Sequence, residues 1–262
     1  MPIVNLAEQL AHAARDLNSS DVEQTLEQAV TLALELVDGC DGAGVTLARR
    51  GHTLETSAAT AEFVARGDAL QYELQEGPCI DAVWEHEIVI STDLANEARW
   101  TAWGPRVVAE LGVQSLMCIQ LFVEDEILGA LNIYSMRESG AFTRREDRYV
   151  GQNLATHISL ALFAAQQIEH LNLTAIRRDL IGQAEGILME RYDINAKGAF
   201  EILKVVASGS KVSLFSVAED IVVTRHMPTE QLTPPAITPP SRTAPVLVDL
   251  GPDDSQAASA AM

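Results

Sequence analysis

The side chain whose type and setting best suit chemistry is the thiol of Cys79. A Gly77-Pro78 turn precedes this residue, and the residues that follow it can begin a helix. A thiol at the N-terminus of a helix has a lowered pKa and becomes a candidate nucleophile or redox group. Glu76 and Asp81 oppose this, because neighbouring carboxylates disfavour a thiolate. The alternative is that Cys79 only fills the junction between loop and helix, and the sequence leaves both interpretations open.

The other residues that could do chemistry form no recognisable catalytic or metal-binding pattern. The six histidines are scattered, no C-x-x-C pair occurs, and phosphate-loop, dinucleotide-loop, zinc-protease and serine-hydrolase motifs are absent. We therefore expect neither a metal site nor an enzyme, although an enzyme that uses Cys79 together with a second cysteine remains a third hypothesis. Cys40 and Cys118 are expected in the core, because free cysteine packs as a small hydrophobe.

Two glycines, Gly182 and Gly186, interrupt an otherwise strong helical segment. Each costs about 1 kcal/mol relative to alanine inside a helix. Because residues four apart share one face of a helix, the pair predicts that another surface approaches this face closely. That surface is either a neighbouring helix or the backbone of a nucleic acid.

The elements that position these residues follow from hydrophobic periodicity. The pattern predicts an α+β fold: an antiparallel sheet with helices mainly before and after it, then a long connecting helix and a C-terminal three-helix bundle. Helices are expected within 1–37 (two of them), 61–73 and 101–111, and strands at 45–47, 53–58, 88–90, 116–123 and 127–134. The expected domains are 1–170, 171–225 and a disordered, proline-rich tail over 226–262.

A single helix without proline is expected from Arg144 to about Arg191. Its narrow apolar seam is typical of a coiled-coil dimer, but it could equally pack on the sheet of its own chain, and one helix can do both. The seam consists of Val150, Leu154, Ile158, Leu162, Ala165, Ile168 and Leu171. In the bundle that follows, Asn195 and Ser213 are predicted helix N-caps. The predicted inner face of the middle helix is Ala199, Phe200, Leu203 and Val206.

The balance of charge limits the partners of this chain. The 262 residues include 47% hydrophobic residues and carry a net charge of −19, which argues against a generic binder of nucleic acid or anionic membrane. The acidity lies in 1–170 and in the tail, whereas 171–225 holds seven basic and seven acidic residues. No leader segment and no apolar run of about 20 residues occurs, so we expect a cytoplasmic protein that does not enter a membrane.

The region 172–225 resembles the ANTAR domain, a small three-helix RNA-binding module of transcription antitermination regulators. The resemblance rests on three blocks in order, Arg177–Arg191, Ala199–Leu203 and Val217–Glu219. In this family, paired domains bind a two-hairpin element of a nascent transcript and prevent the terminator from forming. The resemblance therefore implies an RNA partner and a homodimer. By position, it implies the following RNA-binding residues: Arg177, Arg178, Gln183, Gly186, Arg191, Lys204 and Lys211.

This chain departs from the family pattern at several of these positions. Glu185 stands where the family usually has a lysine, Lys211 stands where it often has asparagine, and Ser213 lies where a basic residue is common. A carboxylate that faces RNA repels phosphate. The alternative function is therefore a sensor whose C-terminal bundle serves only for dimerisation or protein docking.

The region 20–168 is similar to GAF sensor domains, and the pair resembles actinobacterial cytoplasmic regulators. The similarity rests on Gln75–Cys79, Leu111–Leu116, Leu128–Tyr134 and Phe142-Thr143. It implies a pocket for a small-molecule effector between the sheet and the helical segments of 60–110. The ligands of the family range from cyclic nucleotides to tetrapyrroles and haem, so the sequence names no cofactor. The candidate ligand-binding residues are Cys79, Trp84, Trp100 and Trp103, and the alternative for the tryptophans is ordinary packing.

Overall fold

The computed structural model describes residues 3–17, 19–85, 87–137 and 140–226 of the chain. These residues form two compact units that divide between Leu173 and Thr174. Apart from His226, the predicted tail over 226–262 lies outside the described residues. Within the described part, no helix combines the length and the apolar character that crossing a membrane requires.

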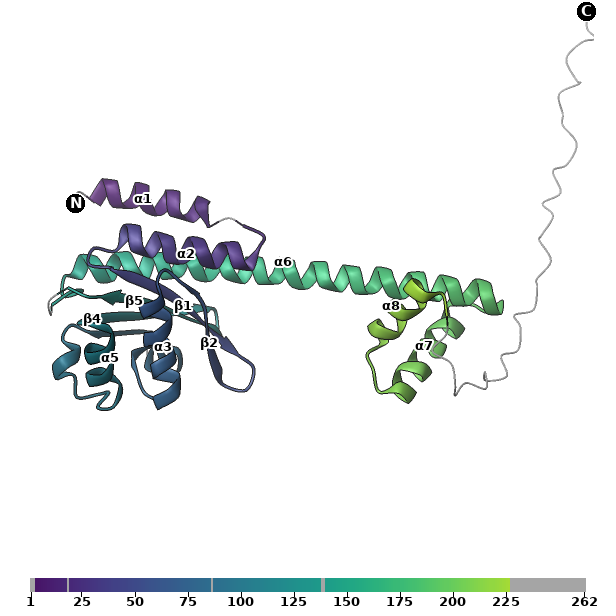
Figure 1. Cartoon of the computed structure of the whole chain (residues 1–262). Helices are drawn as coiled ribbons and strands as arrows, with labels where there is room; N and C mark the ends of the chain where they lie inside the picture. Colours follow the sequence, from purple (N-terminus) through teal and green to yellow (C-terminus); the bar gives the residue numbers. More distant parts are fainter. Residues whose placement is uncertain (1–2, 18, 86, 138–139, 227–262) are drawn as a thin grey trace, which may run out of the picture. The chain divides into compact units, whose positions relative to one another are not determined.

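The first unit is built on a five-stranded antiparallel sheet (Figure 1). In the order β2-β1-β5-β4-β3, its strands are β2 (Thr53–Ala59), β1 (Gly42–Arg49), β5 (Glu126–Ser135), β4 (Ser115–Val123) and β3 (Ile88–Ser91). β5 lies between β1 and β4 and is buried along most of its length, which explains its long apolar run. A Cβ at Gly129 of β5 would collide with the carbonyl group of Thr46, so a glycine is required where β5 passes β1.

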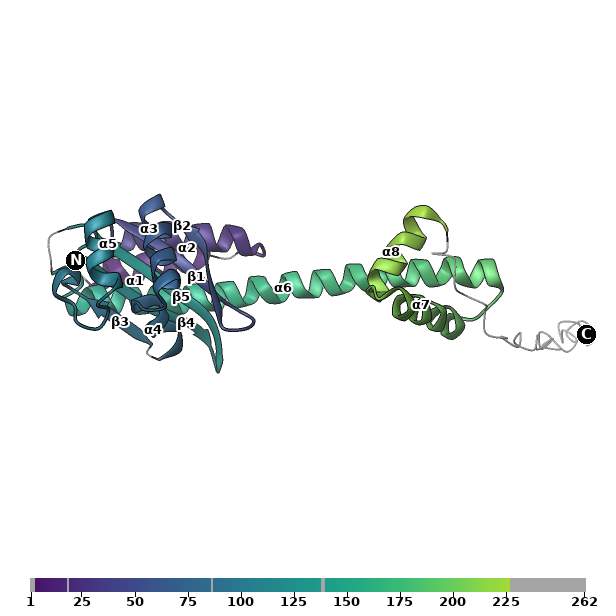
Figure 2. The ribbon, with the colours of Figure 1, turned by 60° about the horizontal axis from the view of Figure 1, so that its bottom comes forward.

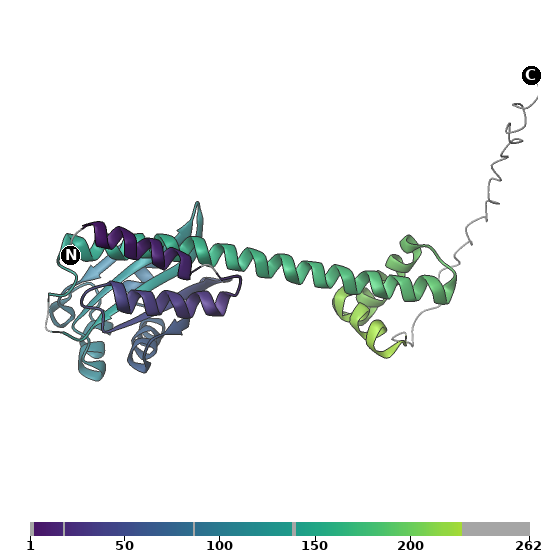
Figure 3. The same ribbon diagram turned by 90° about the horizontal axis from the view of Figure 1, so that it is seen from above.

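Helices cover both faces of the sheet. α2 (Val22–Leu36) and the first part of α6 (Arg145–Tyr192) lie on one face, with α1 (Ile3–Asp16) beside them (Figures 1 and 3). The other face carries α3 (Glu62–Leu74), α4 (Pro78–Trp84) and α5 (Trp103–Leu111), as Figure 2 shows. A short 3-10 helix, η1 (Leu94–Asn96), precedes α5. Each face has its own hydrophobic core, and the predicted α+β fold class is confirmed.

Local sequence signals explain where several of these helices begin and end. The carboxylate of Asp21 accepts a hydrogen bond from the backbone N–H of Gln24 and so caps α2. Pro78 lies in the first turn of α4, where a residue without an N–H is tolerated. Gly112 ends α5 in a left-handed conformation with φ +73°.

The predicted long helix exists as α6, and its apolar seam has two different environments. From Val150 to Leu162 the seam residues are buried against the sheet of the same unit, and Ala165 is buried as well. Ile168 and Leu171, which continue the seam, are 39% and 64% exposed. The intramolecular alternative is therefore right for the first part of the helix, and the later part presents an open apolar surface.

The second unit is a three-helix bundle made by the end of α6, α7 (Ala196–Ser210) and α8 (Leu214–Thr224). Both predicted caps are confirmed, because Asn195 accepts from the N–H of Gly198 and Ser213 accepts from the N–H of Ser216. The buried residues of α7 are Ala199, Ile202, Leu203, Val206 and Ala207.

The prediction that Phe200 faces inward is wrong. Its side chain is 39% exposed, and the Nζ atom of Lys204 lies 5.7 Å from its ring centroid. Ile202 takes the core position instead, because Ala199, Ile202 and Leu203 follow the i, i+3, i+4 spacing of one helix face. Phe200 is one residue beyond Ala199 and therefore turns about 100° away from the core.

Candidate functional site

All seven residues expected to bind RNA are exposed and lie in the second unit. α6 carries five of them, Lys204 lies on α7, and Lys211 follows the end of α7. α6 directs its five residues to different sides. The Cζ atom of Arg177 lies 5.8 Å from the ring centroid of Phe215 on α8, whereas Gly186 is on the face away from the core residue Ala184. The structure thus gathers these residues in one unit without aligning them on one face.

Several of these side chains already have partners within the unit. Gln183 Nε2 donates to Asp179 Oδ2 at 3.0 Å, and Lys204 Nζ pairs with Glu201 Oε1 at 3.0 Å. Arg191 Nη2 donates to the backbone oxygen of Arg225 at 2.7 Å. Lys211 differs from these residues, because its side chain forms no hydrogen bond or ion pair with any other described residue. Lys211 has φ +55°, at the left-handed C-cap of α7, and its ammonium is free to meet a phosphate.

The glycine pair on α6 presents an open surface. A Cβ built on Gly182 or Gly186 would meet nothing within 4 Å among the described residues. A neighbouring helix of the same chain therefore does not explain the pair. A second copy of the chain and a nucleic acid remain as the surfaces that could approach here.

The tryptophans expected in the ligand pocket are mostly core residues of the first unit. Trp100 and Trp103 are 2% and 0% exposed and meet edge to face at 6.0 Å between ring centroids. Their indole N–H groups donate to Asp81 Oδ2 at 2.8 Å and to the backbone oxygen of Gly67 at 3.0 Å. Trp84 is 37% exposed and packs against the ring of His52. Trp100 and Trp103 thus lie together, and Trp84 is in a different environment.

Of the two interpretations of Cys79, its environment contradicts the activated thiol and supports the packing role. The thiol is 0% exposed, and its Sγ lies 3.3 Å from Asn132 Nδ2. Burial, reinforced by the nearby carboxylate of Asp68, raises the pKa of Cys79 to about 12. The N-terminus of α4 therefore does not produce a thiolate here, and Cys79 packs within the first turn of α4. Cys40 and Cys118 are buried, as predicted.

A buried polar cluster that the sequence did not predict is centred on Asp68 of α3. Tyr134 Oη donates to Asp68 Oδ1 at 2.5 Å, Asn132 Nδ2 donates to the same atom at 2.9 Å, and Thr56 Oγ1 donates to Oδ2 at 3.0 Å. Gln71 Nε2 lies 3.4 Å from Asp68 Oδ1. Burial raises the pKa of Asp68 to about 6, although these donors oppose the shift. Polar residues within buried strands were the signal that could have revealed the cluster.

The sequence models of two families match the two units. The GAF domain model matches residues 19–162, and the ANTAR domain model matches residues 169–222. This chain belongs to the GAF domain family. It carries an ANTAR domain after its GAF domain, and this pair of domains fits a regulatory protein. No curated protein matches the sequence.

Three solved structures are similar to this chain, and the first of them shares its fold. A photosensory core module of a Stigmatella aurantiaca phytochrome has a TM-score of 0.52 and 12% identity, covering 76% of this chain and 44% of that chain. The GAF domain of the cyanobacteriochrome TePixJ has a TM-score of 0.46 and 20% identity, covering 57% and 94%. A free methionine-R-sulfoxide reductase from Neisseria meningitidis has a TM-score of 0.49 and 16% identity, covering 62% and 90%.

Glu185, where the ANTAR domain departs from its family, is half-buried at the edge of the bundle core. It follows the fully buried Ala184 and precedes the exposed Gly186. Its carboxylate therefore borders the open glycine face without occupying the centre of that face.

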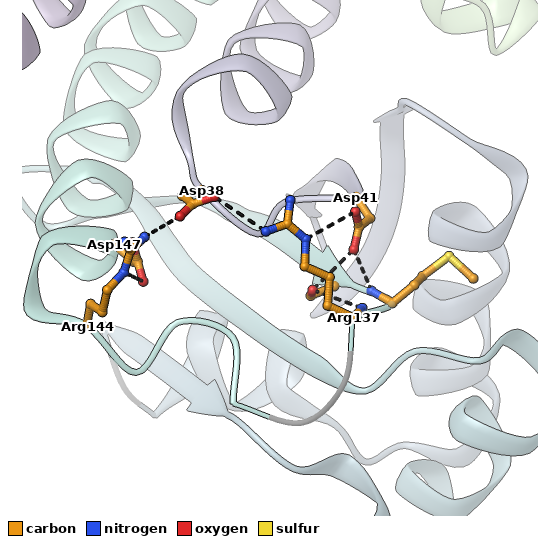
Figure 4. A network of polar contacts seen from close by, with 7 residues as sticks. Asp38, Asp41, Arg137, Arg144 and Asp147 are labelled. Carbon is orange, nitrogen blue, oxygen red and sulfur yellow. Dashed lines mark hydrogen bonds and ion pairs between the residues drawn. The ribbon is translucent and has the colours of Figure 1, made fainter. Parts of the chain in front are cut away.

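Within the GAF domain, an ion-pair network joins the start of α6 to the ends of α2 and β5 (Figure 4). Arg144 bridges Asp147 on α6 and Asp38 after α2, with N–O distances of 2.6 and 2.5 Å. Arg137, after β5, lies 3.4 Å from Asp38 and 3.9 Å from Asp41. The hydrogen bond from Arg144 lowers the pKa of Asp38. Asp38, Arg137 and Arg144 are exposed, so this network positions the helix start and contributes little to stability.

Proposed function

We propose that this protein is a signal-responsive, cytoplasmic RNA-binding regulator without catalytic activity. Its ANTAR domains, paired in a homodimer, bind a two-hairpin element in leader RNA and prevent transcription termination. The observation that carries the proposal is the open surface of the ANTAR domain, where the free ammonium of Lys211, exposed arginines and an uncovered glycine pair remain available. Lysine and arginine neutralise phosphates, and exposed helix backbone at glycines allows close approach.

The electrostatics of the ANTAR domain favour selective binding over tight nonspecific binding. Residues 171–225 carry no net charge, and the acidic GAF domain repels RNA at long range. Affinity must then come from shape and a few direct contacts, and two domains must act together. We expect binding that weakens as salt rises, because phosphate contacts release counterions.

The dimer is supported by an exposed seam along α6. The seam is exposed, and its residues recur at alternating spacings of four and three. They are Ala164, Ile168, Leu171, Ala175, Arg178 and Gly182. This is the heptad spacing of a two-stranded coiled coil. A mainly apolar hollow of about 470 Å³ continues the seam toward α1, lined by Ala14, Leu17, Ser19, Ser20, His157, Leu160, Ala161, Ala164 and Ile168. Arg178 lies within the seam, so it contacts either the second copy or RNA, and a variant distinguishes the two.

The GAF domain supplies the signal in this proposal. A small-molecule effector that binds between the sheet and α3–α5 would alter the packing around Trp100 and Trp103, as the family resemblance implies. The stimulus acts on dimer formation, since α6 both packs on the sheet and carries the exposed seam.

The direct test measures binding of the full chain to a labelled two-hairpin RNA. The matched control RNA has the same length and composition but retains one hairpin. We expect a shift in fluorescence anisotropy for the two-hairpin RNA that weakens with rising salt, and at least tenfold weaker binding of the control RNA. Equal binding of both RNAs would contradict recognition of the hairpin pair.

A second function keeps the ANTAR domain as a dimerisation or protein-docking module. The half-buried carboxylate of Glu185 beside the glycine face and the exposed ring of Phe200 favour it. A chain that dimerises but shows no shift with leader transcripts captured by crosslinking in cells would support this function instead.

A further inference from the structure

The polar cluster of the GAF domain contains a carboxyl group without a counter-ion. Asp68 is 0% exposed, and its donors are the neutral groups of Tyr134, Asn132, Thr56 and Gln71. Among the described residues, no lysine, arginine or histidine pairs with it. An ionised carboxylate in such a place is disfavoured, and binding a proton removes its charge.

A second observation concerns the neighbouring amide. The Oδ1 atom of Asn132 is buried and accepts no hydrogen bond, although Asn132 Nδ2 faces Asp68 Oδ1 at 2.9 Å. Rotation of this amide by 180° exchanges its oxygen and nitrogen. The rotated oxygen would then face Asp68, which is favourable only when Asp68 carries a proton to donate. Asn132 Nδ2 also donates to Thr46 Oγ1 at 3.0 Å, and that hydroxyl group can donate to the oxygen after rotation. Rotation therefore brings an amide oxygen that has no partner now to both the protonated carboxyl and the Thr46 hydroxyl.

We propose that Asp68 and Asn132 form a reversible proton-binding site in the core of the GAF domain. The ionised carboxylate accepts from Asn132 Nδ2. When a hydronium ion gives its proton to Asp68 and leaves as water, the amide rotates and Asn132 Oδ1 accepts from the new O–H group. No electrons are transferred, and the net charge of the core changes by one.

The other titratable groups around the site stay neutral in the pH range where Asp68 responds. Their pKa values are raised, because burial disfavours their charged forms. These groups are Tyr72 on α3, Cys79 on α4, Cys118 on β4 and Tyr134 on β5. β1 and β2 contribute only the hydroxyl groups of Thr46 and Thr56. Near pH 6 the cluster therefore titrates through Asp68 alone.

Gln71 links this site to the start of α4. Its Nε2 lies 3.4 Å from both Asp68 Oδ1 and Tyr134 Oη, and its Oε1 accepts from the backbone N–H of Cys79 at 2.7 Å. A change of charge on Asp68 alters the strength of its hydrogen bond with Gln71 Nε2. The side chain of Gln71 also accepts the hydrogen bond that fixes the first turn of α4. The proton-binding site is thereby coupled to the helices on this face of the sheet, independently of any RNA.

The test follows carboxyl and amide signals of the full chain by NMR between pH 4.5 and 8, with ¹³C-labelled aspartate and ¹⁵N-labelled asparagine. We expect one aspartate carboxyl to titrate near pH 6, with the side-chain amide of Asn132 shifting at the same midpoint. Asp68→Asn should remove the step, whereas the control Asp125→Asn, in the exposed β4–β5 turn, should retain it. A step that persists in Asp68→Asn, or no carboxyl titrating above pH 5, would overturn the proposal.

Two further variants keep the test decisive if Asp68→Asn does not fold. Tyr134→Phe and Thr56→Val each remove a donor that stabilises the ionised form, so each should raise the midpoint, with the larger shift in Tyr134→Phe. An unchanged midpoint in both would also overturn the proposal. RNA binding is measured separately on the same samples, so its loss or retention has no bearing on the proton site.

Discussion

Arg191 at the end of α6 donates from Nη2 to the backbone oxygen of Arg225, which follows α8, at 2.7 Å. Arg225 is the left-handed C-cap of α8, so this hydrogen bond joins the C-terminal end of α6 to the C-terminal end of α8 within the ANTAR bundle. A residue that the family resemblance assigns to RNA therefore has a structural partner of its own.

We expect Arg191→Ala to destabilise the ANTAR domain by about 1 kcal/mol, since a charged donor to a backbone carbonyl is lost at an exposed position. Native-state hydrogen exchange of α7 and α8 measures the effect without interference from the GAF domain. Glu190→Ala, which removes an exposed charged side chain next to Arg191 on the same helix, is the control and should leave exchange unchanged. Equal exchange in both variants would assign Arg191 no structural role.

Lys211 is expected to contact a phosphate. Lys211→Gln should weaken binding of the two-hairpin RNA several-fold and reduce the slope of log affinity against log salt by about 1. Arg50→Gln, at an exposed position of the GAF domain, changes the net charge equally and should leave the slope unaltered. If both variants lose the same affinity, the effect is one of overall charge and Lys211 makes no direct contact.

The seam of α6 predicts which apolar residues hold the dimer together. Leu171→Glu places a charge within the seam and should raise the dimer dissociation constant at least tenfold in analytical ultracentrifugation. Leu173→Glu is a matched control, because Leu173 is also exposed, at 46%, but lies about 200° around the helix. Arg178→Ala belongs to the same experiment. A change in dimerisation would show that Arg178 contacts the second copy, and a change in the salt slope alone would show that it contacts RNA.

The sequence could predict most of the fold, because strands and caps depend on neighbouring residues. The apolar run before Val123 and the cap at Asn195 are examples of such local signals. The sequence could not predict where the seam of α6 changes from buried to exposed. The same spacing of apolar residues is compatible with packing on the sheet of the same chain and with packing on a second helix. The prediction for Phe200 is wrong for a related reason. An apolar residue beside Ala199 could lie in the core by its type alone, and only the packing of the bundle shows that Ile202 takes this core position.

The candidate sites were less predictable than the fold. The partners of Asp68 come from β2, α3 and β5, and their polar side chains have no shared spacing in the sequence. The sequence could not decide between the two interpretations of Cys79, because the local turn indicates a helix N-terminus whereas the pKa of the thiol depends on burial by distant strands. Both cases depend on tertiary contacts that one sequence does not encode as a motif.

The raised pKa of Asp68 predicts how the stability of the GAF domain depends on pH. The folded protein holds this proton up to about pH 6, whereas the unfolded chain releases it near pH 4, so the stabilising contribution is present at low pH and is lost as the pH rises through 6. Relative to Asp68→Asn, the wild-type free energy of unfolding should fall by on the order of 3 kcal/mol between pH 4 and 7. Urea unfolding followed by tryptophan fluorescence measures this, because all three tryptophans lie in the GAF domain. A difference that does not vary with pH would contradict the shift.

The open glycine face of α6 predicts that stability and function change in opposite directions. Gly182→Ala and Gly186→Ala should each stabilise the ANTAR domain by about 1 kcal/mol, because alanine is the better helix former and the added Cβ meets nothing within the described structure. If a second copy or RNA approaches this face, the double variant should weaken dimerisation or RNA binding. Gly209→Ala is the matched control, since Gly209 lies in α7 with equally open space and should stabilise without affecting either. Retention of dimerisation and RNA affinity in the double variant would show that nothing docks on this face.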